Sequence, residues 1–339
     1  MKLNSIRAGF LGIAASASFL VLGALGDIDA RADEDLIVLR GITPWVEDYD
    51  LSQSFFIFKD LVEEKLAGKV EVQYLGGPEI AAPEQQLEAL RNGVVDVILG
   101  AAAYYRAEVP AAAAVQFTQL PPTELRKSGY YDLMREIHRD QAGVVYLANT
   151  SGGNKFRMYM TKKISKPDFS GLKIRVSPVY APLVRALNGA PISMPPGDVY
   201  TGLERGTIDG YGWTYTGIDV FGWHEVSNYV IDHPFYSLDG AILINEQVWE
   251  GLPDDVKQGL EEVGVELEKR VEQHIAQAMA KGDERLKELG MEFIRFSPED
   301  AEKYVQTAYE AGWADFLKSN AAYFEKHPGL AEKLQQLGQ

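Results

Sequence analysis

The sequence has no cysteine among its 339 residues. No disulfide can therefore hold the fold, which must rest on the burial of apolar side chains, as a chain of this length allows. The same absence excludes thiolate nucleophiles and cysteine-based zinc or iron–sulfur centres. The histidines follow no metal-ligand spacing, and the chain has no nucleophile elbow, no phosphate-binding P-loop and no His-Glu-x-x-His sequence. Signatures of catalysis are therefore scarce.

Positive charge is in short supply. The chain has 33 Lys and Arg against 49 Asp and Glu, which gives a net charge of −16 at pH 7. A surface this acidic repels nucleic acid and anionic lipid headgroups, so we expect neither as a partner. An anionic ligand would have to be attracted locally, which makes any arginine inside a pocket informative.

Long apolar runs are absent except at the N-terminus, where residues 1–32 have the features of a secretory signal peptide. Lys2 and Arg7 give a positive start, residues 9–26 are uncharged and mostly apolar, and Ala30-Arg31-Ala32 gives a small-x-small cleavage site. A retained membrane anchor is the alternative, because the run is just long enough to span a bilayer. We expect cleavage and export to the periplasm, with the rest of the chain not embedded in the membrane. Its length suits two domains.

Hydrophobic periodicity predicts alternating strands and helices after residue 35. The expected strands are 36–39, 70–74, 94–99, 143–147, 155–160, 172–176 and 207–211. The expected helices are 55–66, 83–92, 181–187, 195–205, 253–279 and one that starts at Ser297. Because the βαβ order occurs twice, we predict an α/β fold whose sheets are mainly parallel and covered by helices.

Two distant segments share one pattern. Residues 90–96 and 203–209 both read Leu-x-x-Gly-x-(Val/Ile)-Asp. Each predicts a helix, a glycine stop and then a strand that carries an aspartate at its carboxyl end. The repeat suggests two related lobes. Since ligands bind outside the carboxyl ends of strands in open α/β sheets, we expect residues 100–105 and 210–215 to line one cleft.

Two arginines stand inside apolar strand patterns, Arg157 in residues 155–160 and Arg175 in residues 173–176. An arginine in such a place faces either solvent or a cleft, and periodicity alone favours solvent. A guanidinium that does enter a cleft presents a planar fork, which fits a carboxylate.

Three aromatic residues alternate after the second repeat. Tyr211, Trp213 and Tyr215 therefore point to one face of a strand. They either pack in the core or, because Gly210 and Gly212 stand among them, belong to a loop that lines a pocket. Both interpretations stay open at this point.

The order of several segments resembles the TRAP-transporter solute-binding proteins, the dicarboxylate-binding DctP-like family. The segments are 169–176 (Phe-Ser-Gly-Leu-Lys-Ile-Arg-Val), 187–190 (Leu-Asn-Gly-Ala), 195–200, Leu203, 206–210 (Gly-Thr-Ile-Asp-Gly) and Leu252-Pro253. The resemblance covers nearly the whole chain after the leader. It implies a two-lobed α/β binding protein with mixed sheets, crossing strands and a long lobe-spanning helix. Lobe I would hold residues 33–154 plus about 241–280, and lobe II residues 155–240 plus about 281–325, with the C-terminal helices packed across both.

The resemblance also implies roles for single residues. In this family the arginine of the Gly-Leu-Lys-x-Arg strand, here Arg175, forms a paired salt bridge with the ligand carboxylate. A second arginine on the preceding strand, here Arg157, commonly assists. The residue at Trp213 usually contacts the ligand, and tryptophan is found there in relatives that bind 2-oxo acids.

The sequence departs from the family pattern at two places. Members that use a metal carry a glutamate just before the tryptophan, whereas this chain has Gly212, so we expect no metal and no other cofactor. The first-lobe positions that are charged in sialic-acid binders are Ala101 and Tyr104. The cleft should therefore be less polar, with Tyr104, Tyr211 and Trp213 available to an apolar or aromatic ligand.

We interpret the chain as a periplasmic binding subunit, not an enzyme, that passes a small monocarboxylate, 2-oxo or aromatic, to the membrane subunits of a TRAP permease. A C4-dicarboxylate or sugar-acid binder of the same family is one alternative. Another is a periplasmic enzyme that uses His224, Glu225 or Asp232. A third is a ligand-sensing subunit of a signalling system.

Overall fold

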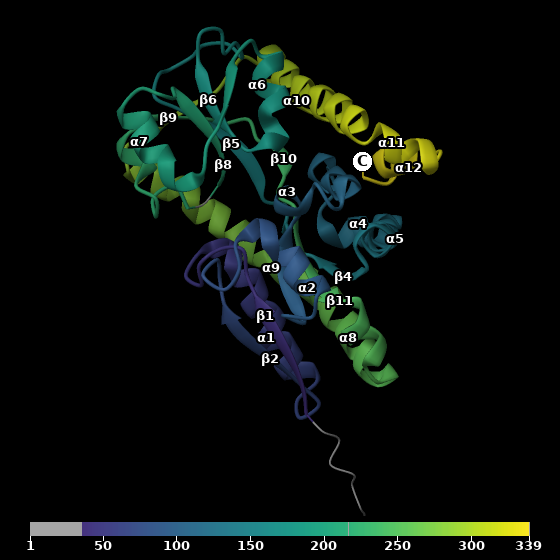
Figure 1. Ribbon diagram of the computed structural model, residues 1–339. Coiled ribbons are helices and arrows are strands. Elements are labelled where there is room, and N and C mark those ends of the chain that lie inside the picture. Colours follow the sequence, from purple (N-terminus) through teal and green to yellow (C-terminus); the bar gives the residue numbers. More distant parts are fainter. Residues whose placement is uncertain (1–35, 216, 339) are drawn as a thin grey trace, which may run out of the picture. The chain divides into compact units, whose positions relative to one another are not determined.

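A computed structural model describes residues 36–215 and 217–338 (Figure 1). The predicted signal peptide, residues 1–32, lies outside the described residues. Within the described ranges, no helix is both long and apolar enough to cross a bilayer.

The first sheet has five strands in the order β2-β1-β3-β11-β4. They are β1 (Ile37–Ile42), β2 (Val70–Gly76), β3 (Val97–Ala101), β4 (Val144–Asn149) and β11 (Gly240–Asn245). β1 is parallel to β2 and β3, whereas β11 is antiparallel to β3 and β4. β3, β4 and β11 are buried along their whole length, which explains their continuous apolar sequences.

The second sheet has seven strands, six of them in the order β12-β9-β5-β8-β6-β7, and β10 also pairs with β5. They are β5 (Lys155–Met160), β6 (Lys173–Val176), β7 (Ala190–Ser193), β8 (Gly210–Thr214), β9 (Tyr229–Ile231), β10 (Phe235–Ser237) and β12 (Glu292–Ile294). β6 is parallel to β7 and β8, and β9 is parallel to β12. β5 is antiparallel to β8, β9 and β10.

The predicted α/β fold with mixed sheets is confirmed, but the mainly parallel arrangement is wrong for part of each sheet. The antiparallel strands are those that arrive from the other sheet, β5 directly after β4 and β11 directly after β10. A parallel neighbour needs a long crossover, usually a helix, and these strands enter without one. The lobe limits proposed from the sequence stay a prediction.

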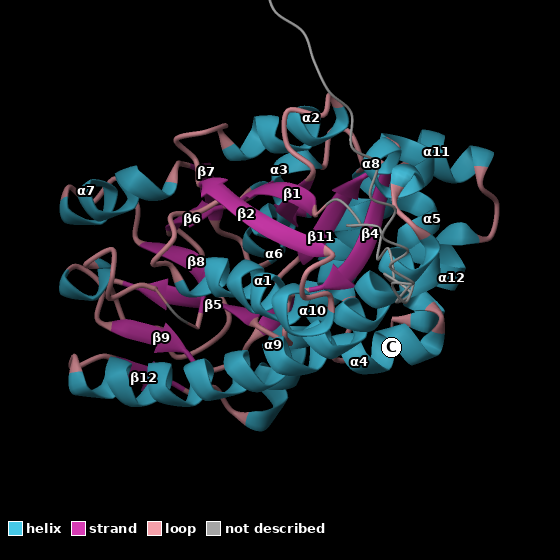
Figure 2. Ribbon diagram, turned by 90° about the horizontal axis from the view of Figure 1, so that it is seen from below, coloured by secondary structure: helices cyan, strands magenta, loops and turns pink. Residues whose placement is uncertain are grey.

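Helices surround both sheets (Figure 2). They are α1 (Gln53–Lys65), α2 (Gln86–Arg91), α3 (Ala102–Tyr105), α4 (Pro122–Ser128), α5 (Tyr130–Ala142), α6 (Ala181–Ala186), α7 (Val199–Glu204), α8 (Glu246–Gly251), α9 (Asp254–Glu288), α10 (Pro298–Ser319), α11 (Ala321–Lys326) and α12 (Leu330–Leu337). Both views place α7 beside the second sheet and α8 beside the first. Sequence periodicity did not find α3, α4, α5, α8, α11, α12 or the 3₁₀ helix over Pro110–Phe117.

The long helix α9 packs against both sheets, as predicted. Val263 and Leu267 pack in the core of the first sheet, whereas Leu286 belongs to the core of the second. The next long helix, α10, also begins where the sequence predicted, because the Ser297 side chain accepts a hydrogen bond from the Asp300 amide at 3.2 Å. α10 then contacts α6 and the 3₁₀ helix over Pro110–Phe117.

The repeated sequence pattern corresponds to a repeated structure. The Asp96 carboxylate accepts the Arg40 amide at 2.8 Å, and the Asp96 amide donates to the Arg40 carbonyl at 2.8 Å. Asp209 and Lys173 make the same reciprocal pair, at 2.9 and 2.7 Å. Each aspartate therefore joins a strand to its parallel neighbour.

The position of these aspartates corrects the sequence analysis. The strands begin after them, at β3 (Val97–Ala101) and β8 (Gly210–Thr214), so each aspartate lies at the amino end of its strand and not at the carboxyl end. The basic side chains repeat as well, since Arg40 donates to the Gly93 carbonyl and Lys173 to the Gly206 carbonyl, at 3.0 and 2.7 Å. These contacts need a left-handed glycine after each helix, and both glycines have positive φ.

Candidate functional site

Arg175 lies on β6 and is only 4% exposed. Its Nε donates to the Met194 carbonyl at 2.9 Å, and its Nη1 lies 3.1 Å from the Tyr180 hydroxyl and 3.4 Å from the Gly212 carbonyl. The Trp213 ring centre is 5.4 Å from the guanidinium carbon. No carboxylate among the described residues forms an ion pair with Arg175. A buried guanidinium that has only neutral partners can accept an anion.

Arg157 lies on β5 and is equally buried, at 3% exposed, but its partners differ. It donates to both Asp283 oxygens, at 2.6 and 3.2 Å, and lies 3.2 Å from Asp232. Its guanidinium also covers the Tyr215 ring at 3.6 Å. Burial acts to lower the pKa of Arg157, but the Asp283 hydrogen bond and the nearby charges raise it overall. Because two carboxylates already balance its charge, Arg157 is a weaker candidate for a ligand than Arg175.

Tyr211 has no exposed surface. Its ring stacks on Tyr159 at 5.1 Å and meets the edge of Trp223 at 4.9 Å, and its hydroxyl pairs with Ser227. Of the two interpretations given for Tyr211, core packing or a pocket-lining loop, the structure shows core packing in this conformation. Its contact with a ligand stays a prediction.

Trp213 lies on the same face of β8 as Tyr211, but on the side of that face toward the first sheet. Its indole N–H donates to the Tyr49 hydroxyl at 3.1 Å. Tyr49 comes from the segment that follows β1, a strand of the first sheet. Trp213 thus connects the surroundings of Arg175 with the opposite side of the molecule.

Tyr104 completes this aromatic connection. It lies on α3, where its hydroxyl accepts the Trp45 indole N–H at 3.2 Å, and Trp45 in turn meets Tyr49 with ring centres 6.0 Å apart. Burial and the charge of Asp239 raise the pKa of the Tyr104 phenol, while the positive charge of Arg175 acts in the opposite direction. The structure therefore places Tyr104 in the electrostatic surroundings of Arg175.

Sequence reasoning missed Trp45 and Tyr49. Both follow β1, a strand of the first sheet, just as Tyr104 follows β3. The rule that ligand-binding residues follow the carboxyl ends of strands selected residues 100–105 and applies equally to this segment. That signal could have found them.

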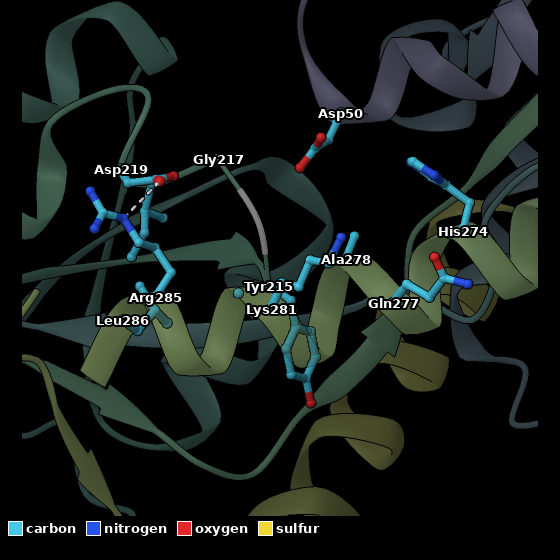
Figure 3. A pocket seen from close by; sticks show the side chains of 12 residues that line it. Asp50, Tyr215, Gly217, Asp219, His274, Gln277, Ala278, Lys281, Arg285 and Leu286 are labelled. Carbon is cyan, nitrogen blue, oxygen red and sulfur yellow. Dashed lines mark ion pairs between the residues drawn. The ribbon is translucent and has the colours of Figure 1, made fainter. Parts of the chain in front are cut away.

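Two hollows lie where β6 and β8 end. One of about 290 Å³ adjoins Tyr215 and is walled by Asp50, by α9 and by the Asp219–Arg285 ion pair (Figure 3). It carries both signs of charge, which does not select an anion. The other, of about 650 Å³, lies beside Val176, the residue after Arg175, and is bounded by the 3₁₀ helix over Pro110–Phe117 and by α10. Both hollows adjoin strand ends, but neither is lined by residues from both 100–105 and 210–215, so the single cleft expected between these segments stays a prediction.

Of the three groups named for the enzyme alternative, Asp232 and Glu225 serve other contacts, whereas His224 Nδ1 is buried without a hydrogen-bond partner among the described residues. Asp232 pairs with Arg157 and Arg295, the His233 ring nitrogen accepts the Phe296 amide, and Glu225 accepts the Tyr200 hydroxyl. Among the described residues, no group of three or more His, Asp or Glu side chains is placed to hold a metal.

Asp239 is a buried carboxylate beside this site, at the junction of β10 and β11. It is 3% exposed and accepts the Ala103 amide at 2.6 Å. Burial raises its pKa from 3.8 to about 6, while the hydrogen bonds from Ala103 and Gln116 act to lower it. Ala103 belongs to α3, which carries Tyr104. Asp239 therefore joins the segment between β10 and β11, which runs from the second sheet to the first, to α3, the helix that carries Tyr104.

The raised pKa predicts a pH dependence of stability. Between about pH 4 and 6 the folded state keeps a proton on Asp239 that the unfolded state has lost. The contribution of Asp239 to the free energy of unfolding therefore falls as pH rises through this window. Asp239→Asn keeps the shape without the charge. We expect its stability relative to the wild type to increase from pH 4 to 6, by up to about 3 kcal/mol. Urea denaturation across this range measures the difference. Asp48→Asn at an exposed carboxylate is the control, and a difference that is constant with pH would contradict the assignment.

The chain is similar to known proteins of one family. The model of the DctP family, bacterial extracellular solute-binding protein, family 7, matches residues 47–320. The C4-dicarboxylate-binding periplasmic protein DctP of Rhodobacter capsulatus is 26% identical over 226 residues, which are 62% of this chain and 65% of that protein. The matched region thus spans less than two thirds of that relative.

Solved structures share the fold over most of the chain. A TRAP periplasmic solute-binding protein from Rhodobacter sphaeroides superposes with a TM-score of 0.77 at 23% identity, over 89% of this chain and 100% of that one. Another from Desulfovibrio salexigens, solved with bound orotic acid, gives 0.76 at 21% identity, over 88% of this chain and 99% of that one. At these identities the likeness concerns the fold.

Proposed function

The chain belongs to bacterial extracellular solute-binding protein family 7, the DctP family, and from this premise we propose that it captures a small organic acid for a TRAP transporter. As the periplasmic subunit it would pass the acid to the membrane permease, which supplies the energy. Family membership argues against the enzyme alternative, and two of its three candidate groups, Asp232 and Glu225, have structural partners.

One observation carries the proposal: the guanidinium of Arg175 is buried without a carboxylate partner. A buried charge is costly unless it is paired, so an unpaired one that persists points to a missing anion. Arg157 lies on the same sheet with two carboxylates beside it, which makes the contrast local. We assign the ligand carboxylate to Arg175. With the contacts described above, Arg157 would assist indirectly, by keeping Tyr215 and strand β5 in position behind Trp213.

We further propose that the ligand is a monocarboxylate, 2-oxo or aromatic. Arg175 offers one fork, and Ala101 on the side of the first sheet supplies no second charge. A second carboxylate would lack a partner there, which costs several kcal/mol in a closed site. Trp213 and Tyr104 offer flat apolar faces for the rest of the ligand. The Rhodobacter capsulatus relative is named for C4-dicarboxylates, so these are the principal alternative.

Export follows from the same proposal. A cleaved leader over residues 1–32 would place the chain in the periplasm, where the permease can receive its ligand. A sensory subunit would use the same carboxylate site. A neighbouring gene for a permease favours transport, whereas a sensor kinase gene alone favours signalling.

A panel of organic acids tests the ligand class. We expect pyruvate or orotate to raise the Tm by several degrees more than succinate, malate or fumarate, because a ligand at a hundredfold excess over Kd adds about 2.7 kcal/mol of stability. Thermal-shift assays rank the acids, and calorimetry gives Kd for the best of them. The uncharged amide of the best ligand serves as control and should give no shift. Tighter binding of any C4-dicarboxylate than of every monocarboxylate would contradict the proposal.

A further inference from the structure

The surroundings of Arg175 contain a second residue that sequence reasoning did not select. Tyr180 is 1% exposed and its ring packs against Phe156 and Phe235, with centres 5.3 and 5.9 Å away. Its hydroxyl donates to the Gly212 carbonyl at 2.7 Å. The hydroxyl proton is thereby committed, so the oxygen lone pairs are left for Arg175 Nη1 at 3.1 Å.

Gly212 makes this arrangement possible by having no side chain. A Cβ at this position would lie 2.5 Å from Tyr180 Cε2 and 2.9 Å from Cζ, closer than real carbon atoms approach. Gly212 has no positive φ, so its backbone does not require glycine. The ring of Tyr180 takes up the space of the missing side chain. The same contact excludes a glutamate at 212 unless Tyr180 moves.

Two of the three guanidinium nitrogens of Arg175 are therefore held by the protein. Nε donates to the Met194 carbonyl, and Nη1 donates to the Tyr180 hydroxyl and the Gly212 carbonyl, two acceptors only 2.7 Å apart that can share one N–H. Arginine has five N–H donors in a fixed plane. Nη2 has no hydrogen-bond partner among the described residues, so its two donors and the second N–H of Nη1 remain for a ligand.

We propose that Tyr180 is the positioning residue of the anchor, and that it turns Arg175 so that the guanidinium meets a carboxylate end-on through Nη1 and Nη2. The proposal rests on the function proposed above. A side-on pair through Nε is excluded, because Met194 occupies that donor. Tyr180 itself need not contact the ligand. Its effect is to hold the long arginine side chain in its binding orientation before the ligand arrives, which lowers the entropic cost of binding.

Tyr180→Phe removes the hydroxyl and keeps the ring. In the ligand-free protein, ¹³C–¹⁵N NMR of the guanidinium measures rotation about the Nε–Cζ bond of Arg175, with the signal assigned from Arg175→Lys. We expect rotation to become about tenfold faster and the Kd for pyruvate and orotate to rise about tenfold, the effect of losing one hydrogen bond to a charged group. The matched control is Tyr130→Phe, whose hydroxyl is equally buried and has no hydrogen-bond partner among the described residues. It should change neither quantity.

The results separate the two proposals. If Arg175→Lys abolishes binding while Tyr180→Phe leaves the NMR rotation and the Kd as in the wild type, the positioning role is wrong and the anchor stands. If the rotation accelerates but Arg175→Lys leaves binding unchanged, the positioning is right and the anchor is wrong. Gly212→Ala gives an independent check, since its Cβ must displace a chemically intact Tyr180 and should accelerate the rotation as well.

Discussion

Arg175→Lys should weaken binding of the best organic acid by a factor of roughly thirty to several thousand, equivalent to about 2–5 kcal/mol. The substitution keeps the positive charge but loses the planar fork, and an ammonium cannot pair a carboxylate through two parallel hydrogen bonds. Calorimetry measures the change in Kd. Arg139→Lys, at an exposed position on α5, is the control and should bind as the wild type.

The anchor role of Arg175 also predicts the stability of the protein without ligand. Arg175→Met removes a buried charge that has no carboxylate partner, so the free energy of unfolding without ligand should stay within about 1 kcal/mol of the wild type. The Met194 carbonyl loses its Arg175 donor, which limits any gain. Unchanged Kd in Arg175→Lys would refute the anchor. A large loss of stability in Arg175→Met would show that the guanidinium serves the fold instead.

Arg157→Met should do the reverse and lower the free energy of unfolding by about 3 kcal/mol. Removing this guanidinium leaves Asp283 and Asp232 without their common partner and uncovers Tyr215. The expected loss is at the lower end of the range for broken buried pairs, because the Asp283 side chain is 31% exposed and Asp232 keeps Arg295. Urea denaturation without ligand measures it.

A double-mutant cycle identifies the source of this loss. Arg157→Met combined with Asp283→Leu should lose less stability than the sum of the two single variants, since neither charge is then left alone. Additive losses would mean that Arg157 acts through packing on Tyr215 and not through the ion pair. A large rise in Kd with little loss of stability would instead assign Arg157 to the ligand.

The two arginines illustrate the limit of sequence patterns. Each stands in a short apolar strand with similar neighbours, and periodicity alone favoured solvent for both. Both are buried. The difference between them depends on Asp283 and Asp232, which are distant in sequence and reach Arg157 only through α9 and the end of β9. No local pattern contains that information.

The sequence predicted the edge of the sheet at which β3 and β8 end better than the limits of these strands. Residues 97–101 and 210–214 form strands that begin after Asp96 and Asp209, whereas the sequence placed the aspartates at the carboxyl ends. Tyr104, which follows β3, and Trp213, near the end of β8, nevertheless lie near Arg175. The reason is that a shift of a few residues along a strand changes its limits but not the edge of the sheet at which it ends.

By itself the sequence determined the class of fold, the family, the long helix α9, the start of α10 at Ser297 and the repeat built on Asp96 and Asp209. These features depend on local periodicity, on capping side chains and on short motifs. Only the tertiary structure decided the direction of β5 and β11, the packing of Tyr211, and the partners of Arg157 and Arg175. Each of these depends on contacts between distant segments, and a side chain's charge balance and burial are properties of all the groups that surround it.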